Sequence, residues 1–334
     1  MADRRDYKNR CAQMKRIPIR NLTVLAALAA AVCCAYLLFR AYPENPVLFG
    51  YILSLRIPAL AAMVLAAAAI GSATIVFQTV INNRIVTPCL LGMNSLYTLI
   101  HTAVVFAAGS GSILAVNSNL SFAVDLLVMG VSAAFVYSYM FRKTGNNVLY
   151  VMLIGTVISS FFSSVQSALI RVMDPNEYDV LLTSLVADFN HVNGEVILFG
   201  AGLLALLAVF LRKDLKLLDV IILGKAQSVN LGVDYDRTVR RLLLGVVLCI
   251  AVATAMVGPV SFLGLIIANL SRQLLKTHRH SFLIPGAVFM GIMAVIAGQL
   301  ISQHLFSYGV PVSTFVTIGG GIYFLYLLLK KGEL

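Results

Sequence analysis

Charged residues are scarce in this chain: they make up 12% of the sequence, whereas a soluble domain typically carries about a quarter. Hydrophobic residues account for 60% of the sequence, and the mean hydropathy is +0.91. Apolar runs of about 15–25 residues recur from end to end, and this is the length needed to cross about 30 Å of hydrocarbon. The composition therefore excludes a soluble globular domain and predicts an all-α polytopic membrane protein.

Motifs of membrane-embedded and ATP-hydrolysing enzymes are also lacking. An ATPase needs a Gly-rich loop that ends in Gly-Lys-Ser or Gly-Lys-Thr, but the only Gly-Lys pair, Gly224-Lys225, is followed by Ala226. His278 and His280 have no carboxylate beside them in the sequence for a metal site. No Gly-x-Ser-x-Gly frames a serine nucleophile, and the five cysteines lack metal-ligand spacing. We expect no catalytic residue, metal site or cofactor in this chain.

Ionisable residues are also rare inside the apolar runs. An ion-coupled secondary transporter usually keeps an ionisable group at mid-membrane. Of the 14 acidic residues, only Asp125 falls inside an apolar run, and it lies near the outer end of that run. This pattern argues against an ion-coupled carrier and favours a transport protein that takes its energy from elsewhere.

Ten apolar runs are long enough to be candidate membrane spans. They cover residues 21–41, 57–80, 88–108, 119–141, 148–172, 195–211, 239–257, 261–275, 281–304 and 311–329. We interpret residues 1–20 as a tail and residues 21–331 as one membrane domain, with the first run retained as a span rather than cleaved as a signal peptide. The run at 261–275 is short, and Gly258-Pro259 before it predicts a bend, because proline removes a helix donor.

The positive charges set the orientation of this threading. All but three of the 25 Lys and Arg residues fall on one side, and the exceptions are Arg40, Arg56 and Arg171. Cytoplasmic loops carry the excess of Lys and Arg, so both termini are predicted to be cytoplasmic. The net charge of +11 is then explained by topology and by contact with anionic lipid headgroups rather than by nucleic-acid binding. The longest outer loop, residues 173–195, is acidic, and its middle, residues 178–189, is expected to form a short helix.

The longest cytoplasmic loop covers about residues 211–240. It is too polar to span and too apolar for a plain linker, and Gly224 and Gly232 divide it into short helical pieces. Leu217, Leu218, Val220, Ile221 and Leu231 are expected to be exposed and to need cover. Two interpretations remain open: an amphipathic loop that lies on headgroups, or a short helix that docks into a groove of a soluble protein.

Several sequence blocks resemble the iron-chelate and vitamin B12 uptake permeases (FecCD-type) of ABC importers. Residues 223–233 resemble the family's LGxxxAxxLGV stretch, and residues 55–58 resemble the start of its L-R-x-P-R block. Further blocks follow in the family's order at residues 78–92, 258–266 and 311–325. The resemblance covers about residues 50–330 and implies the type II ABC importer permease fold.

The resemblance implies a permease subunit in the bacterial cytoplasmic membrane that imports ferric siderophore. Its partners would be a second permease, two cytoplasmic ATPase subunits that bind ATP, and an extracytoplasmic siderophore-binding protein that docks at Arg56. The residues implied to couple to the ATPases are Leu223, Gly224, Lys225, Ala226, Gln227, Ser228, Leu231, Gly232 and Val233. A corrinoid, haem or another metal chelate is the alternative substrate.

The chain departs from the family pattern on its outer side. Ala59 replaces the second Arg of L-R-x-P-R, and Gln299 and Gln303 stand where an Asp and an outer Arg are common. These departures favour a heterodimer in which the other permease supplies the missing Arg residues. The pattern around residues 81–97 resembles most the second permease of catecholate-type systems, such as those for petrobactin or enterobactin.

A polar stripe on the fifth run marks a possible transport pathway. The candidate lining residues are Gln78, Ser159, Ser160, Ser163, Ser164 and Gln166. The alternative is structural, because serine in membrane helices often serves close packing or hydrogen-bonds to its own helix carbonyls.

Overall fold

The computed structural model describes residues 2–39, 46–143, 148–190, 192–307 and 309–331, and these residues form helices and no strands. The longer helices are α1 (Ala2–Leu38), α2 (Pro46–Ile81), α3 (Met93–Ala108), α5 (Ser118–Lys143), α6 (Val148–Val172), α8 (Gly194–Lys216), α11 (Tyr235–Val257), α12 (Leu263–Leu275), α13 (His280–Leu305) and α14 (Val312–Lys331). The short ones are η1 (Pro88–Leu91), α4 (Ile113–Val116), α7 (Pro175–Ser184), α9 (Leu218–Ile221) and α10 (Lys225–Asn230). The predicted all-α class is confirmed.

The ten longer helices coincide one by one with the ten predicted runs. Six are long and apolar enough to cross a membrane by length and composition: Pro18–Leu38 of α1, then α2, Tyr150–Val172 of α6, α8, α11 and α13. The apolar parts of α3, α5, α12 and α14 are shorter. The chain is therefore a multi-pass membrane protein.

Three helices begin far from the predicted boundaries. Helix α1 begins at Ala2 and so extends through the predicted tail of residues 1–20. Helix α2 begins at Pro46, well before the predicted start at residue 57, so Arg56 lies inside the helix rather than just before its first residue. The run predicted from residue 88 begins as the 3-10 turn η1, and α3 starts only after Gly92, whose φ is +83°. Proline at residue 88 and the left-handed Gly92 set this separation.

The predicted bend at Gly258-Pro259 is a full break in the helix. Helix α11 ends at Val257, Gly258 has φ +85°, and α12 starts at Leu263 after the left-handed Phe262, with φ +61°. In the loop predicted to be outer, α7 overlaps the expected helix of residues 178–189, but it begins at Pro175 and ends at Ser184. The side chains of Asp174 and Asn193 cap α7 and α8 by accepting hydrogen bonds from Asn176 N and Glu195 N.

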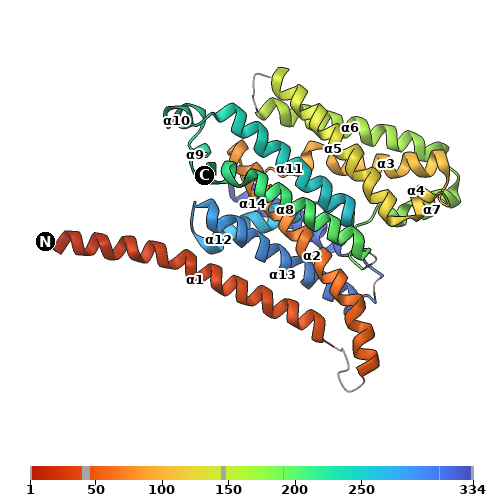
Figure 1. Cartoon of the computed structure of the whole chain (residues 1–334), viewed down its shortest axis with the longest axis horizontal. Coiled ribbons are helices and arrows are strands. Elements are labelled where there is room, and N and C mark those ends of the chain that lie inside the picture. The colour runs from red at the N-terminus through yellow and green to blue at the C-terminus, as the bar shows by residue number, and fades with distance from the viewer. Residues whose placement is uncertain (1, 40–45, 144–147, 191, 308, 332–334) are drawn as a thin grey trace.

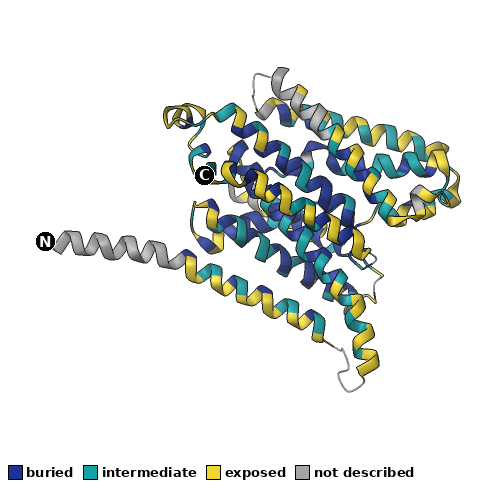
Figure 2. Cartoon of the chain, in the orientation of Figure 1, coloured by how far each residue is buried: buried dark blue, intermediate teal, exposed yellow. Residues whose placement is uncertain are grey.

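Helix α2 forms the centre of the bundle. It packs against α11 and α13 most extensively, and against α12 and α8. Ala62, Ala66 and Ala67 are completely buried, as expected for an Ala-rich segment that lets neighbouring helices approach closely. Figure 2 shows buried residues along α2 and α11, whereas exposed residues run along α1, α6 and α8.

One close approach depends on a glycine. A Cβ atom at Gly264 of α12 would overlap the hydroxyl group of Thr74 in α2. The Thr74 hydroxyl donates to the Ile70 carbonyl at 2.7 Å, so it is held against α2 by its own helix. Glycine therefore sets the distance between α2 and α12.

The two longest predicted loops, residues 211–240 and 173–195, lie at opposite ends of the bundle. In Figure 1 the start of α1 and the short helices α9 and α10 lie at the left, and α4 and α7 lie at the right. This arrangement agrees with the threading that places the N-terminal tail and the 211–240 loop on one side and the 173–195 loop on the other.

Candidate functional site

The 211–240 loop, which is predicted to be cytoplasmic, folds into two short helices, α9 and α10, that meet at Gly224. Gly224 has φ +91° and Gly232 has φ +82°, values that favour glycine, so the two predicted bend positions are confirmed. The Ser228 side chain is fully buried, and its hydroxyl contacts the carbonyl oxygens of Val220 at 2.9 Å and Gly224 at 2.8 Å. The serine therefore fastens α10 to α9.

The loop presents an exposed surface around α10. Leu223, Val229 and Leu231 are 53–63% exposed. Of the remaining predicted coupling residues, the exposed ones are Lys225, Ala226, Gln227 and Gly232, whereas Gly224 and Val233 are half-buried. Lys225 Nζ lies 2.9 Å from a carboxylate oxygen of Asp236, which ties the start of α10 to α11. The loop thus presents a small projecting surface that carries three exposed apolar side chains.

The expectation that Leu218 and Ile221 are exposed is wrong. Both are buried in the main hydrophobic core, where α9 packs against α2. Their burial anchors the loop to the membrane bundle, and the large apolar side chains that stay exposed are those of Leu223, Val229 and Leu231.

At the opposite end of the bundle, the side chain of Arg56 in α2 contacts the C-terminal end of helix α1. Its Nη1 contacts the carbonyl oxygens of Tyr36 at 2.9 Å, Leu37 at 3.2 Å and Phe39 at 2.7 Å. The guanidinium carbon lies 5.7 Å from the centre of the Tyr36 ring. A cation at a helix C-terminus satisfies the last carbonyls and interacts favourably with the helix dipole, so Arg56 has a structural role whatever else it binds.

Arg56 also lines a cavity of about 690 Å³ between α1, α2, α13 and the loop after α7. We call it the outer cavity, because the predicted orientation places it on the outer side. Gln299 and Gln303, two of the departures from the family pattern, line the same cavity. Gln299 Nε2 donates to Asn190 Oδ1 at 2.7 Å, while its buried Oε1 has no hydrogen-bond partner among the described residues. The cavity thus gathers one cation, the carboxylate of Asp188 and several amide groups.

The predicted pathway residues on α6 fall into two groups. Ser159 contacts Ser95 at 2.7 Å between hydroxyl oxygens, Ser163 donates to Ser95 at 3.3 Å, and Gln166 accepts from Thr98 at 2.9 Å. Ser159, Ser163 and Gln166 therefore join α6 to α3. Ser160 and Ser164 are exposed and donate to carbonyls of their own helix.

Gln78, the remaining predicted pathway residue, is 2% exposed. Its amide nitrogen donates to the Arg84 carbonyl at 2.8 Å, and its amide oxygen accepts from Arg272 at 3.2 Å. In this structure Gln78 therefore holds the loop after α2 against α12 and faces the inside of the bundle.

Two histidine–aspartate contacts between distant helices were not predicted from the sequence. His101 of α3 and Asp125 of α5 pair inside the bundle, and His280 at the start of α13 pairs with Asp219 of α9. The partners are 24 and 61 residues apart, so no local spacing signals either pair.

Comparison with known proteins places these features in a family. The FecCD transport family model matches residues 21–330. The chain is 39% identical over 317 residues to the petrobactin import system permease protein YclO of Bacillus subtilis (strain 168), covering 94% of this chain and 99% of that relative. It is 31% identical over 279 residues to the petrobactin import system permease protein FatC of Bacillus anthracis, covering 84% and 79%.

A solved structure has the same fold. It is described as an inward-facing conformation of a metal-chelate type ABC transporter, and it covers 94% of this chain and 99% of its own chain with a TM-score of 0.81. The sequence identity is 22%, so this likeness concerns the fold alone. It agrees with the predicted permease fold of about ten membrane helices.

Proposed function

The chain belongs to the FecCD transport family, and we propose that it is the membrane-spanning permease of an ABC importer that takes up ferric siderophore. The observation that carries this proposal is the 39% identity, over nearly the whole of both chains, to a permease named for petrobactin import. Petrobactin or a related catecholate chelate is therefore the proposed substrate class.

The exposed surface around α10 supports a soluble partner for the energy-supplying step. Burying a Leu or Val side chain contributes roughly 1.5–3 kcal/mol, and Leu223, Val229 and Leu231 are all more than half exposed. We assign this surface to a cytoplasmic ATPase subunit. The permease itself supplies the moving membrane helices, and ATP is bound and hydrolysed by the partner.

The charge distribution supports the orientation. The basic N-terminal tail, residues 1–20, and the 211–240 loop share one side, where Lys and Arg accumulate in the loops. We propose that both termini lie in the cytoplasm of a bacterial cell, that residues 21–331 form one permease domain in its cytoplasmic membrane, and that the 173–195 loop faces the binding protein.

The outer cavity supports pairing with a different permease. A homodimer would present two copies of the same amide-rich cavity, in which Arg56 already contacts two carbonyls of α1 and the carbonyl of Phe39 directly after it. A second permease that brings its own Arg residues would restore the positive charge for docking an acidic binding protein. We therefore propose a heterodimer.

Deletion of the gene followed by iron-uptake assays tests the proposed function. Cells starved of iron are given ferric petrobactin, ferric enterobactin, haem or a corrinoid, and uptake is compared with that of a complemented strain. Loss of ferric catecholate uptake alone supports the proposal. Loss of haem or corrinoid uptake instead assigns the alternative substrate, and full uptake of every compound overturns the importer role. Recovery of an ATPase and a second permease with the tagged chain tests the assembly.

A further inference from the structure

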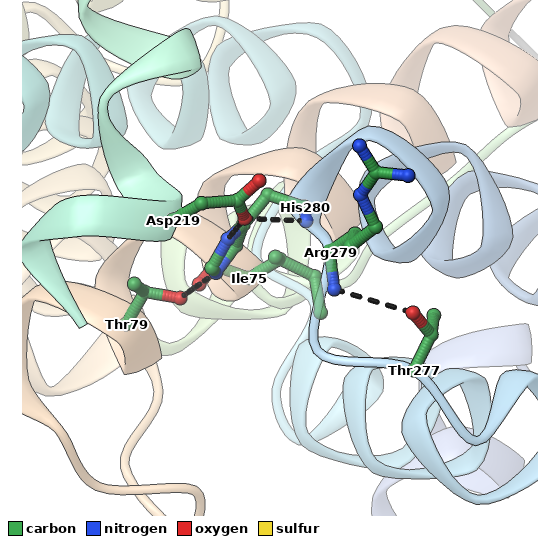
Figure 3. Close-up of polar contacts among 6 residues, drawn as sticks. All are labelled: Ile75, Thr79, Asp219, Thr277, Arg279 and His280. Atoms are coloured by element: carbon green, nitrogen blue, oxygen red, sulfur yellow. Dashed lines mark hydrogen bonds and ion pairs between the residues drawn. The ribbon is translucent and has the colours of Figure 1, made fainter. Parts of the chain in front are cut away.

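A continuous chain of polar contacts joins the cytoplasmic loop to two membrane helices. Asp219 of α9 lies 2.5 Å from the Nδ1 atom of His280 at the start of α13, measured from Oδ1. The same Oδ1 atom accepts from the His280 backbone N–H at 2.9 Å. The other ring nitrogen, Nε2, lies 2.8 Å from the Thr79 hydroxyl near the end of α2. Figure 3 shows the three side chains in line.

Asp219 fixes the direction of the imidazole ring. A carboxylate only accepts hydrogen bonds, so the Nδ1 atom that faces it carries a proton. Burial acts to raise the pKa of Asp219, but the hydrogen bonds from the backbone and ring of His280, together with the charges of His280 and Arg279, hold the pKa below its ordinary value. Asp219 is therefore a carboxylate at neutral pH, and Nε2 is held toward α2.

This order of groups, carboxylate, imidazole and hydroxyl, is also that of a nucleophilic triad. Here the hydroxyl cannot serve as a nucleophile, because Thr79 and His280 are each only 2% exposed and Thr79 Oγ1 also lies 2.7 Å from the Ile75 carbonyl. No substrate can reach the hydroxyl. The arrangement instead links three elements at fixed positions.

The link continues to the surface assigned to the ATPase. Ser228 ties α10 to α9 through the carbonyl of Val220, the residue directly after Asp219. The side chain of Leu218, on the other side of Asp219, is fully buried against the bundle. A displacement of α10 therefore reaches Asp219 through the contact of Ser228 with the Val220 carbonyl.

We propose that Asp219, His280 and Thr79 form the joint through which movement of the ATPase-docking loop is passed to α2 and α13. This inference rests on the proposed function, because it requires an ATPase at α10. Asp219 and His280 are positioning residues: they touch neither ATP nor the transported chelate. They make the loop, α2 and α13 move together, so that ATP hydrolysis produces transport.

The test uses the complete importer, with both permeases and the ATPases in proteoliposomes and the binding protein added. ATP hydrolysis and ferric siderophore uptake are measured on the same sample. Asp219→Ala removes both contacts to His280, whereas Asp219→Asn keeps an oxygen that accepts from Nδ1 and from the backbone N–H. Thr79→Val removes the hydroxyl at similar volume. Asp214→Asn is the matched control, because Asp214 is a buried carboxylate at the end of α8 that pairs with Arg241 at 4.0 Å.

For Asp219→Ala and Thr79→Val we expect hydrolysis within about twofold of the wild type and a fall of about tenfold in uptake, a typical size for coupling between sites. Asp219→Asn and Asp214→Asn should keep the wild-type ratio of uptake to hydrolysis. The joint is overturned if Asp219→Ala and Thr79→Val keep that ratio, or if neither variant assembles with the ATPase. A wild-type complex without ferric siderophore uptake would instead overturn the proposed function.

Discussion

His101 of α3 and Asp125 of α5 face each other inside the membrane bundle, with Nε2 of the histidine 2.9 Å from Oδ2 of the aspartate. Asp125 is 2% exposed, and the Tyr97 ring lies against His101 with ring centres 4.3 Å apart. Ionisable side chains inside a membrane usually pair with one another. The pair joins α3 to α5 inside the bundle.

Removing one member of this pair should destabilise the protein more than removing both. Asp125→Leu leaves the half-buried His101 without its acceptor, and leaving a polar group unpaired inside a protein costs about 1–3 kcal/mol. The double variant His101→Phe with Asp125→Leu keeps the ring contact to Tyr97 and leaves no buried polar group. We expect its thermal unfolding temperature in detergent to lie closer to the wild type than that of Asp125→Leu. Equal or additive losses would show that the two residues act independently.

Leu231→Asp should detach the ATPase. Leu231 is 63% exposed on the surface next to α10, and burying a leucine side chain contributes roughly 1.5–3 kcal/mol. We expect ATPase binding to weaken by about 10–100-fold, with the permease still present in the membrane. Val180→Asp is the control, because Val180 is 50% exposed on α7 at the opposite side. Normal binding and uptake with Leu231→Asp would contradict the role of this surface.

Arg56→Glu should slow the docking of the binding protein. Charge reversal changes association rates more than the stability of a bound complex, and an exposed ion pair contributes only about 0–1 kcal/mol. The loss should be largest at low salt, because salt screens exposed charges. Arg171→Glu, an exposed position at the outer end of α6, is the control.

The contacts of Arg56 to the last carbonyls of α1 provide an internal check on this prediction. Arg56→Glu also removes these contacts, so the unfolding temperature should fall together with the association rate. A lower unfolding temperature with an unchanged association rate would leave Arg56 a purely structural residue.

Gly264→Ala should be destabilising and should be rescued by a second change. The new methyl group would overlap the Thr74 hydroxyl, and inserting a methyl group into a packed core costs about 1–3 kcal/mol. Thr74→Ala removes the obstacle and loses only a hydrogen bond to the carbonyl of its own helix. The unfolding temperature of the double variant should exceed that of Gly264→Ala. Failure of the rescue would mean that another contact limits the distance between α2 and α12.

The contribution of Asp219 to stability should disappear in acid. A carboxylate whose pKa is lowered by folding stabilises the protein above its unfolded pKa of about 3.9, and this stabilisation is lost as the pH falls through the lower folded pKa. The unfolding temperatures of the wild type and Asp219→Asn should therefore differ by a constant amount near neutral pH and converge below about pH 4. A difference that grows in acid would contradict the lowered pKa.

The helices and the bends of the cytoplasmic loop could be predicted because each depends on local chemistry. A membrane span is fixed by the length and hydropathy of one run, and Gly224 and Gly232 stand at bends because their backbones need positive φ. The burial of Leu218 and Ile221 could not be predicted, because it depends on where α9 lies against α2.

The polar contacts of the site were predicted less well, because they depend on the relative rotation of helices that are distant in sequence. The serine stripe of α6 was visible, but only the position of α3 decides that Ser159 bonds across to Ser95 while Ser160 bonds to its own helix. The contact of His280 with Asp219 depends in the same way on the placement of α13 beside α9.

Helix α2 carries Arg56 near one surface of the membrane bundle and Thr79 near the other, within one uninterrupted helix from Pro46 to Ile81. At 1.5 Å per residue, the two positions are separated by about 35 Å along the helix axis. Pro58 removes one backbone hydrogen bond within this helix. A helix that tilts about its middle moves its two ends in opposite directions. If a protein that docks at the outer cavity tilts α2, Thr79 at the other end of the helix also moves. The loop that contacts Thr79 through His280 would move with it. One helix, α2, therefore connects the two faces of the molecule.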